Sequence, residues 1–159
     1  RKKSTQEEIL MEKNFIIRML RKGDFKHWQD QFEKYLDFYE TRISEEIYRV
    51  TFERLINPKI TNQNALVAQK DNKLIGIAHF IYHPHNWKVE NVCYLQDLFV
   101  EKNFRGWGVG YSLITHIYSL ADKHRTPTVY WLTQDFNIQA RKLYDRIGNV
   151  TNFIRYNRT

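Results

Sequence analysis

Four stretches of the chain repeat apolar residues every three or four positions, which is the spacing of one face of a helix. The first repeat begins directly after Asp24, a residue type suited to the N-cap position. The second begins at Ser44 and stops before Pro58, and Gly148 follows the fourth as a C-cap. The spacing predicts helices over residues 25–39, 44–56, 108–124 and 137–147.

Shorter apolar or alternating runs lie between these helices and predict strands. Asp71-Asn72 joins two of the runs as a tight turn, which predicts a hairpin. The predicted strands cover residues 14–20, 64–70, 73–82, 91–100, 128–132 and 151–157. The order β-α-α-β-β-β-α-β-α-β predicts one domain of the α/β (α+β) class over residues 14–159, after a charged N-terminal arm over residues 1–13.

The composition is that of one folded domain. The 159 residues suffice for one core, and 42% hydrophobic residues exclude disorder. No apolar run approaches the ~18 residues of a membrane span and no signal peptide is visible, so we expect no membrane association. Cys93 is the single cysteine and cannot form an internal disulfide, so we expect a reducing, cytoplasmic setting.

A glycine-rich turn, Arg105-Gly106-Trp107-Gly108-Val109-Gly110, joins the fourth predicted strand to the third predicted helix. A strand, such a turn and a helix N-terminus in succession direct backbone N–H groups at one place, which suits a phosphate. Tyr111 stands where a dinucleotide fingerprint has its third glycine, and no Lys-Ser/Thr follows as in a P-loop. The turn therefore predicts a phosphate site of another kind.

The pattern R-x-x-G-x-G at Arg105, Gly108 and Gly110 resembles the acetyl-CoA pyrophosphate loop of the GNAT superfamily of N-acetyltransferases. A second block, N-x-x-A-x-x-x-Y-x-x-x-G over residues 137–148, is similar to the helix that follows the fifth GNAT strand. The resemblance covers roughly residues 14–158. It implies a GNAT fold whose mixed, mostly antiparallel sheet of six to seven strands splays between strands four and five, with about four flanking helices.

Three segments narrow the resemblance to small GNATs that include fungal histone and polyamine acetyltransferases, D-amino-acid acetyltransferases and bacterial relatives. They are YLDFYE at residues 35–40, YLQDLFV at residues 94–100 and PTVYW at residues 127–131. Residues 94–100 also resemble spermidine/spermine acetyltransferases, which carry Glu-Asp where this chain has Gln96-Asp97. That glutamate is a proposed base or water-positioning group, so Gln96 weakens the case for a polyamine acceptor.

The resemblance implies acetyl-CoA as cosubstrate, with its pyrophosphate on the loop amides and its pantetheine arm on the fourth strand. A basic balance in residues 101–159, nine basic against four acidic residues, agrees with a polyanionic ligand. The residues expected at the cosubstrate are Leu98, Phe99, Val100, Arg105, Gly106, Trp107, Gly108, Val109, Gly110, Tyr111, Ser112, Asn137 and Ala140.

Two residues are the catalytic candidates. An alkyl amine has a pKa near ~10.4, so a base must remove its proton at neutral pH. Asp97 is the leading candidate for this base, acting through water, and Glu90 is the second candidate. Residue alternation puts Asp97 and Leu95 on one strand face. The alternative for Asp97 is a carboxylate that orders a loop or a dimer contact. Tyr144 stands where the family places its general acid, and its alternative is an aromatic that packs on the helix.

The acceptor is expected between the first two helices and the third and fourth strands. Tyr35, Tyr39, Glu40 and Tyr82 are the substrate-binding candidates, and an acidic cluster around residues 37–46 suits a cationic acceptor or is simply a solvated face. No metal site is expected, because Pro84 interrupts the nearby histidines and no carboxylate lies at ligand spacing.

The leading hypothesis is an acetyl-CoA-dependent N-acetyltransferase that acts on a primary amine by direct attack. The acceptor stays open between a small amine, a polyamine, an amino acid and a protein lysine. The alternative is an acyl-CoA-binding sensor or scaffold with little turnover; nucleic-acid binding ranks third, because the basic residues are scattered. A homodimer or higher homo-oligomer is expected, because the strand over residues 151–157 leaves an open pairing edge.

Overall fold

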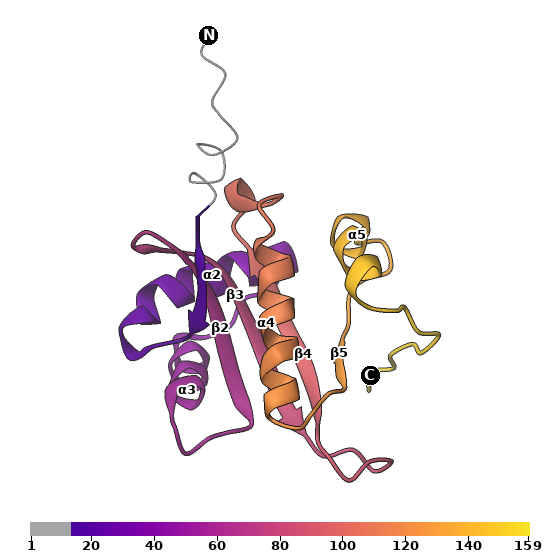
Figure 1. Ribbon diagram of the computed structural model, residues 1–159. Coiled ribbons are helices and arrows are strands. Elements are labelled where there is room, and N and C mark those ends of the chain that lie inside the picture. Colours follow the sequence, from indigo (N-terminus) through magenta and orange to yellow (C-terminus); the bar gives the residue numbers. More distant parts are fainter. Residues whose placement is uncertain (1–13) are drawn as a thin grey trace.

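The centre of the fold is a single sheet in the computed structural model, which describes residues 14–159; the arm expected over residues 1–13 lies outside the described residues. The strand order is β1-β2-β3-β4-β5 (Figure 1). The first four strands pair antiparallel, whereas β5 pairs parallel to β4. The strands are β1 (Ile16–Met19), β2 (Gln63–Lys70), β3 (Lys73–His83), β4 (Val92–Val100) and β5 (Val129–Trp131).

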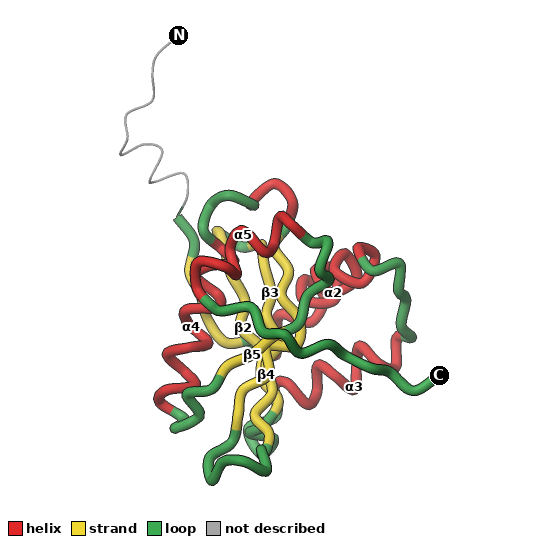
Figure 2. Tube along the Cα trace, turned by 90° about the vertical axis from the view of Figure 1, so that its right-hand side faces the viewer, coloured by secondary structure: helices red, strands yellow, loops and turns green. Residues whose placement is uncertain are grey.

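The helices lie where the apolar spacing predicted them: α2 (Phe25–Phe38), α3 (Glu45–Ile56), α4 (Val109–Lys123) and α5 (Ile138–Ile147). α2 and α3 lie on one side of the sheet and α4 on the other (Figure 2). Two short 3-10 helices, η1 (Lys22–Asp24) and η2 (Lys102–Phe104), precede α2 and follow β4. None of the described helices combines the length and apolar character that crossing a membrane requires.

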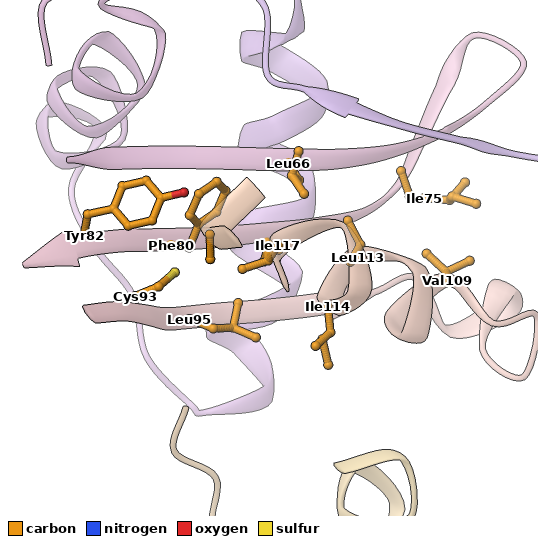
Figure 3. Packing of buried hydrophobic residues seen from close by; sticks show 13 residues of the cluster. Leu66, Ile75, Phe80, Tyr82, Cys93, Leu95, Val109, Leu113, Ile114 and Ile117 are labelled. Carbon is orange, nitrogen blue, oxygen red and sulfur yellow. The ribbon is translucent and has the colours of Figure 1, made fainter. Parts of the chain in front are cut away.

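Each face of the sheet buries its own apolar cluster. Under α4, Leu113, Ile114 and Ile117 pack with Phe80 and Leu95 of the sheet (Figure 3). The cluster between the other face and helices α2 and α3 contains Leu20, Trp28, Phe32, Tyr48, Phe52, Ala65, Val67, Leu74, Ile77 and Phe99. Because β3 and β4 contribute to both clusters, these two strands are held from both sides.

A β-bulge in β4 changes which side chains face which cluster. His79 of β3 pairs with Asp97, but its neighbour Phe80 pairs with Leu95, so Gln96 is the extra residue. The extra residue reverses the alternation, so Leu95 faces α4 whereas the Asp97 side chain contacts His79 on the α2 side. The expectation that Asp97 and Leu95 share a face is therefore wrong, because simple alternation assumes an unbroken strand.

The strand β5 uses only part of the free edge of β4. The parallel pairing is confined to Cys93, Tyr94 and Leu95, whereas β3 pairs with β4 as far as Val100. Beyond Leu95 the two parallel strands separate, as the sequence predicted. Residues 96–100 therefore present an edge that has no strand partner within residues 14–159.

The strand expected over residues 151–157 does not form, and the expectation of six to seven strands is wrong: residues 14–159 contain a five-stranded sheet. The apolar side chains of this segment are exposed, Phe153 and Tyr156 by 86% each. The physical reason is the shortness of β5, which has three residues and leads into the loop before α5. The segment finds no long edge on its own sheet.

Gly148 ends α5, but not through the left-handed conformation that a glycine C-cap usually takes. Its φ is −151°, which is extended, and its N–H donates to the Tyr144 carbonyl at 2.8 Å. A Cβ at this position would lie 2.8 and 3.1 Å from two ring carbons of Trp131. The glycine is therefore required for the close approach of α5 to β5.

We predict that Gly148→Ala destabilises the protein, because the new methyl group must displace a packed indole ring. Overpacking of this kind costs about 1–3 kcal/mol of unfolding free energy. Gly23→Ala is the matched control, since a Cβ there meets nothing within 4 Å. Urea unfolding of both variants measures the effect, and equal midpoints for the two would contradict the assigned contact.

Candidate active site

A cavity of about 520 Å³ opens beside the free edge of β4, among α2, the glycine loop, the start of α4 and α5. Its lining includes three cations, Arg105, Lys142 and Arg146, and no carboxylate. Such a lining suits a polyanionic ligand. The lining residues are Tyr35, Phe38, Tyr39, Leu98, Phe99, Val100, Phe104, Arg105, Gly106, Gly108, Val109, Gly110, Tyr111, Asn137, Gln139, Ala140, Lys142, Leu143, Tyr144 and Arg146.

The glycine loop presents bare backbone to this cavity. Gly106 and Gly108 have φ of +80° and +83°, a region that side chains disfavour. A Cβ on either would meet no protein atom within 4 Å, so packing inside the chain does not explain these glycines. Gly108 is the N-cap of α4, whose first N–H groups have no partner within the helix. The loop therefore offers open space beside backbone N–H groups, which is what the predicted phosphate site needs.

Two residues of the predicted loop set do not line the cavity. Trp107 packs against Phe104, with ring centroids 5.0 Å apart, and belongs to the core under α4. Ser112 lies within the first turn of α4, where its N–H donates to the Gly108 carbonyl at 2.9 Å. Arg105 does line the cavity, and its Nε donates to the Val100 carbonyl at 3.1 Å. This bond holds the guanidinium at the end of β4.

The helix α5 supplies the other long wall. Asn137 caps it: its Oδ1 accepts from the Ala140 N–H at 3.4 Å, and its Nδ2 donates to Thr133 Oγ1 at 3.2 Å. Its amide therefore orders the helix start while also lining the cavity. Lys142 and Arg146 were not identified from the sequence. The sequence did carry a signal for them: they lie four residues apart, and so on one face of the predicted helix that carries Tyr144.

Tyr144 lies where the cavity narrows. Its ring packs on Trp131 of β5, with centroids 5.5 Å apart. Burial, with a further contribution from Tyr39, raises the pKa of Tyr144 to about 12. The phenol is therefore protonated at neutral pH and can donate a hydrogen bond.

A narrower pocket continues from this point between β4 and β5. It shares Tyr35, Tyr39, Leu98 and Tyr144 with the larger cavity, and no charged side chain lines it. The complete lining is Tyr35, Tyr39, Leu95, Gln96, Leu98, Trp131, Leu132, Thr133 and Tyr144. Its volume is about 20 Å³, which is room for about one water molecule, and its walls are aromatic and neutral polar groups.

Two predicted substrate-binding residues are not brought to either pocket. Tyr82 is buried on the α4 side of the sheet, stacked on His124 at 3.9 Å, because alternation along β3 places it with Phe80 (Figure 3). Glu40 follows the end of α2, with a φ of 52°, and lines neither pocket. The predicted acidic rim therefore does not line the acceptor side.

Asp97 is close to the site but lines neither pocket. Its Oδ2 lies 2.8 Å from His79 Nδ1, and His79 Nε2 accepts from Trp28 Nε1–H at 2.8 Å. Tyr35 lines both pockets, and burial first, then the charge of Asp97 and the neighbouring Tyr39, raise the pKa of its phenol. Sequence reasoning missed Trp28 and His79, since the bulge that brings Asp97 to them has no local signature. The described residues contain no cluster of potential metal ligands.

Comparison with known proteins agrees with this geometry. The chain is 33% identical over 152 residues to the D-amino-acid N-acetyltransferase HPA3 of Saccharomyces cerevisiae, over 95% of this chain and 94% of that protein. A ribosomal-protein-alanine N-acetyltransferase from Brucella melitensis biovar Abortus 2308 has a TM-score of 0.77 at 20% identity, covering 92% and 99% of the two chains.

Another solved structure with this fold is that of AAC(6')-Iy in complex with a bisubstrate analog, CoA-S-monomethyl-acetylneamine. Its TM-score is 0.80 at 18% identity, covering 92% of this chain and 98% of that one. The acetyltransferase (GNAT) family model matches residues 25–148, which include the glycine loop and the whole of α5. The chain therefore belongs to the GNAT family of acetyltransferases.

Proposed function

We propose that this protein transfers the acetyl group of acetyl-CoA to the nitrogen of a primary amine by direct attack. The observation that carries the proposal is one continuous site: a glycine loop at a helix N-terminus, three cations and a protonated phenol line the same cavity. The relatives named above act on amines according to their names, namely D-amino acids and ribosomal-protein alanine. An acyl-CoA-binding scaffold would share the loop but would not require Tyr144.

Acetyl-CoA supplies an acetyl thioester and carries phosphates along which it can be held. The amides of Gly108 to Tyr111 are suited to the pyrophosphate, and Arg105, Lys142 and Arg146 can neutralise phosphate charge. The edge of β4 over residues 96–100, which has no strand partner within residues 14–159, offers backbone groups to the pantetheine arm, although the Val100 carbonyl already accepts from Arg105 Nε. An N–H on that edge is suited to polarise the thioester carbonyl.

In this reaction Asp97 is the base and Tyr144 donates to the departing sulfur. The amine must lose a proton before attack, because its pKa is near ~10.4. The narrower pocket offers no carboxylate for the second ammonium of a polyamine. It likewise offers no cation for the carboxylate of an amino acid, so the ranking of D-amino acids ahead of polyamines rests on the 33% identity to a D-amino-acid N-acetyltransferase.

Release of the CoA thiol in the presence of a panel of amines tests the proposal. The panel contains D- and L-amino acids, spermidine, a lysine peptide, a peptide with N-terminal alanine and an aminoglycoside. Release that depends on one amine supports the enzyme, and mass spectrometry of the acetylated product identifies the nitrogen. Acetyl-CoA binding with no release for any amine would favour the scaffold instead.

We predict that acetyl-CoA raises the melting temperature and that Gly108→Val abolishes this rise. A ligand that binds only the folded state adds about 2.7 kcal/mol of stability at one hundred times its Kd. The valine side chain would fill the open space over the loop and cannot easily take a φ of +83°. Melting curves with and without acetyl-CoA measure the shift, with Gly23→Val as the control glycine outside the cavity; a full shift for Gly108→Val would refute the loop assignment.

We predict that Tyr144→Phe lowers kcat and leaves acetyl-CoA affinity almost unchanged, because a donor to sulfur matters only as the C–S bond breaks. The loss should lie toward the lower end of the about 10²–10⁴-fold range of general acid catalysis. A phenol with a pKa of about 12 is a weak acid beside a thiol at ~8.5, so full proton transfer is uphill. Steady-state kinetics on the best amine measures kcat, and a change within about twofold would show a packing role only.

We further propose that the protein is a homodimer held by residues 149–159. Val150, Phe153, Ile154 and Tyr156 are each at least 76% exposed in the single chain, and β5 has an open edge nearby in sequence. Exposed apolar side chains on a segment of strand-like alternation favour pairing with a second copy. We predict a dimer by sedimentation velocity at micromolar concentration, and a shift toward monomer for Phe153→Ser with Ile154→Ser. A monomeric parent protein would contradict the proposal.

A further inference from the structure

One carboxylate links the helix α2 to the end of β4. Glu101 directly follows Val100, the last residue of β4. Its Oε2 accepts from Gln31 Nε2 at 2.7 Å and from Lys34 Nζ at 2.9 Å. Gln31 is 3% exposed and the Glu101 side chain is 23% exposed, so water competes little for the bond between them. We call these three side chains the Glu101 link.

The Gln31 amide serves this link although its own oxygen remains unpaired. Its Oε1 is buried and accepts no hydrogen bond within residues 14–159. Turning the amide over would place that oxygen against the Glu101 carboxylate, which can only accept. A buried polar atom without a partner destabilises a fold. Stability alone therefore does not explain a glutamine at this position.

The charge of Glu101 is likewise unfavourable for the ligand expected here. Glu101 follows Val100, which lines the cavity, and the glycine loop begins four residues later at Arg105. A carboxylate at this place opposes the binding of phosphates. Lys34 compensates part of the charge: its hydrogen bond to Glu101 is the main cause that raises the pKa of Lys34, so the lysine is charged at neutral pH. Glu101 itself lines neither pocket.

On the helix side, the Glu101 link holds the part of α2 that faces the cavity. Gln31 lies one turn before Tyr35, and Lys34 lies one turn before Phe38, so each pair shares a side of the helix. Tyr35 and Phe38 both line the cavity. The two bonds to Glu101 therefore hold the wall that these aromatic side chains form.

On the strand side, Glu101 is fixed to the start of the glycine loop. Its N–H donates to the Ile75 carbonyl of β3 at 2.9 Å, and its carbonyl accepts from the Phe104 N–H at 2.9 Å. Arg105 Nε donates to the Val100 carbonyl at 3.1 Å in the same turn. The carboxylate is thus attached to the backbone that leads into the loop, and the Glu101 link joins two walls of one cavity.

We propose that Glu101 is a positioning residue for acetyl-CoA: through Gln31 and Lys34 it holds the α2 wall of the cavity at a fixed separation from the glycine loop. The inference rests on acetyl-CoA as the cosubstrate of the proposed function. A ligand that contacts both walls binds more tightly when the walls are already placed, because ordering them on binding lowers affinity. Glu101 takes no part in the chemistry and acts only through the residues that it holds.

Glu101→Met tests the link, because charge and position predict opposite results. Methionine keeps the length of the side chain but cannot hold the Gln31 amide. Loss of a negative charge beside the loop would by itself tighten acetyl-CoA binding. We expect the Kd to rise instead, by at least about threefold, toward the lower end of what one hydrogen bond contributes. Titration calorimetry measures the Kd, and unchanged or tighter binding would overturn the proposal.

Two further variants separate the hydrogen bonds from the charge. Glu101→Gln removes the charge but keeps an oxygen that can accept from Gln31 and Lys34, so we expect it to bind acetyl-CoA at least as tightly as the parent. Glu53→Met is the control for charge, since Glu53 is 63% exposed on α3 and lines neither pocket. Binding by Glu101→Gln as weak as that of Glu101→Met would refute the role of the hydrogen bonds.

Gln31→Met tests the other end of the link without any change of charge. It removes the unpaired oxygen, so the melting temperature should equal or exceed that of the parent. We expect acetyl-CoA affinity to fall nevertheless, by at least about twofold, with kcat at saturating acetyl-CoA nearly unchanged. A residue with only a structural role would not move stability and affinity in opposite directions, so parent-like affinity for Gln31→Met would contradict the proposal.

The parent protein separates failure of this inference from failure of the proposed function. If the parent binds acetyl-CoA and acetylates an amine, whereas Glu101→Met and Gln31→Met bind acetyl-CoA as the parent does, the proposed function stands and the positioning role is refuted. If the parent binds no acetyl-CoA, both fall. Weaker binding in Glu101→Met and Gln31→Met, with parent-like or tighter binding in Glu101→Gln and Glu53→Met, is the result that we expect.

Discussion

The extra residue Gln96 in β4 is the constraint on which the site depends. Before it, β4 is paired on both edges and is an ordinary interior strand. After it, the strand has lost its β5 partner and its side chains have changed faces. Asp97 thereby reaches the α2 side, while Leu98 joins the residues packed under α4 and lines both pockets. One inserted residue thus turns a carboxylate toward a histidine at the place where β5 ends and leaves the edge of β4 unpaired within residues 14–159.

The aromatic cluster of α2 and α3 then limits what that carboxylate can do. A lone carboxylate at the edge of this cluster, with a side chain only 14% exposed, would be destabilised by the loss of water. The His79 N–H compensates one oxygen, and the indole N–H of Trp28 compensates the histidine in turn. Replacing these groups with well-packed apolar side chains would often be neutral or stabilising in a protein interior. Their presence next to the pocket is explained better by chemistry than by stability.

The sequence predicted what local spacing controls. The helices follow from apolar repeats. The positive φ of Gly106 and Gly108 follows from a glycine motif, because other residues disfavour that backbone conformation. The errors arise where distant pairing decides the outcome. A bulge reverses alternation after Leu95, so Asp97 changes face, and Tyr82 follows the unbroken alternation of β3 into the core. Residues 151–157 alternate as a strand does, yet β5 is too short to pair with them.

The two ends of the site differ in charge, and this difference bears on the proposed proton transfers. The larger cavity is cationic, whereas the narrower pocket is lined by neutral groups, with Tyr35 and Tyr144 at the junction and Tyr39 beside both. Burial raises the pKa of the Tyr35 phenol and of the Tyr144 phenol, so neither carries a charge at neutral pH. A charged base lining such a pocket would bind an ammonium tightly and hold it protonated. In the proposed reaction the amine would meet the neutral Tyr35 hydroxyl, while Asp97 lies outside both pockets and pairs with His79. A base outside both pockets would leave the entering amine without a carboxylate that stabilises its ammonium form, and the proposed attack on the thioester needs the neutral amine.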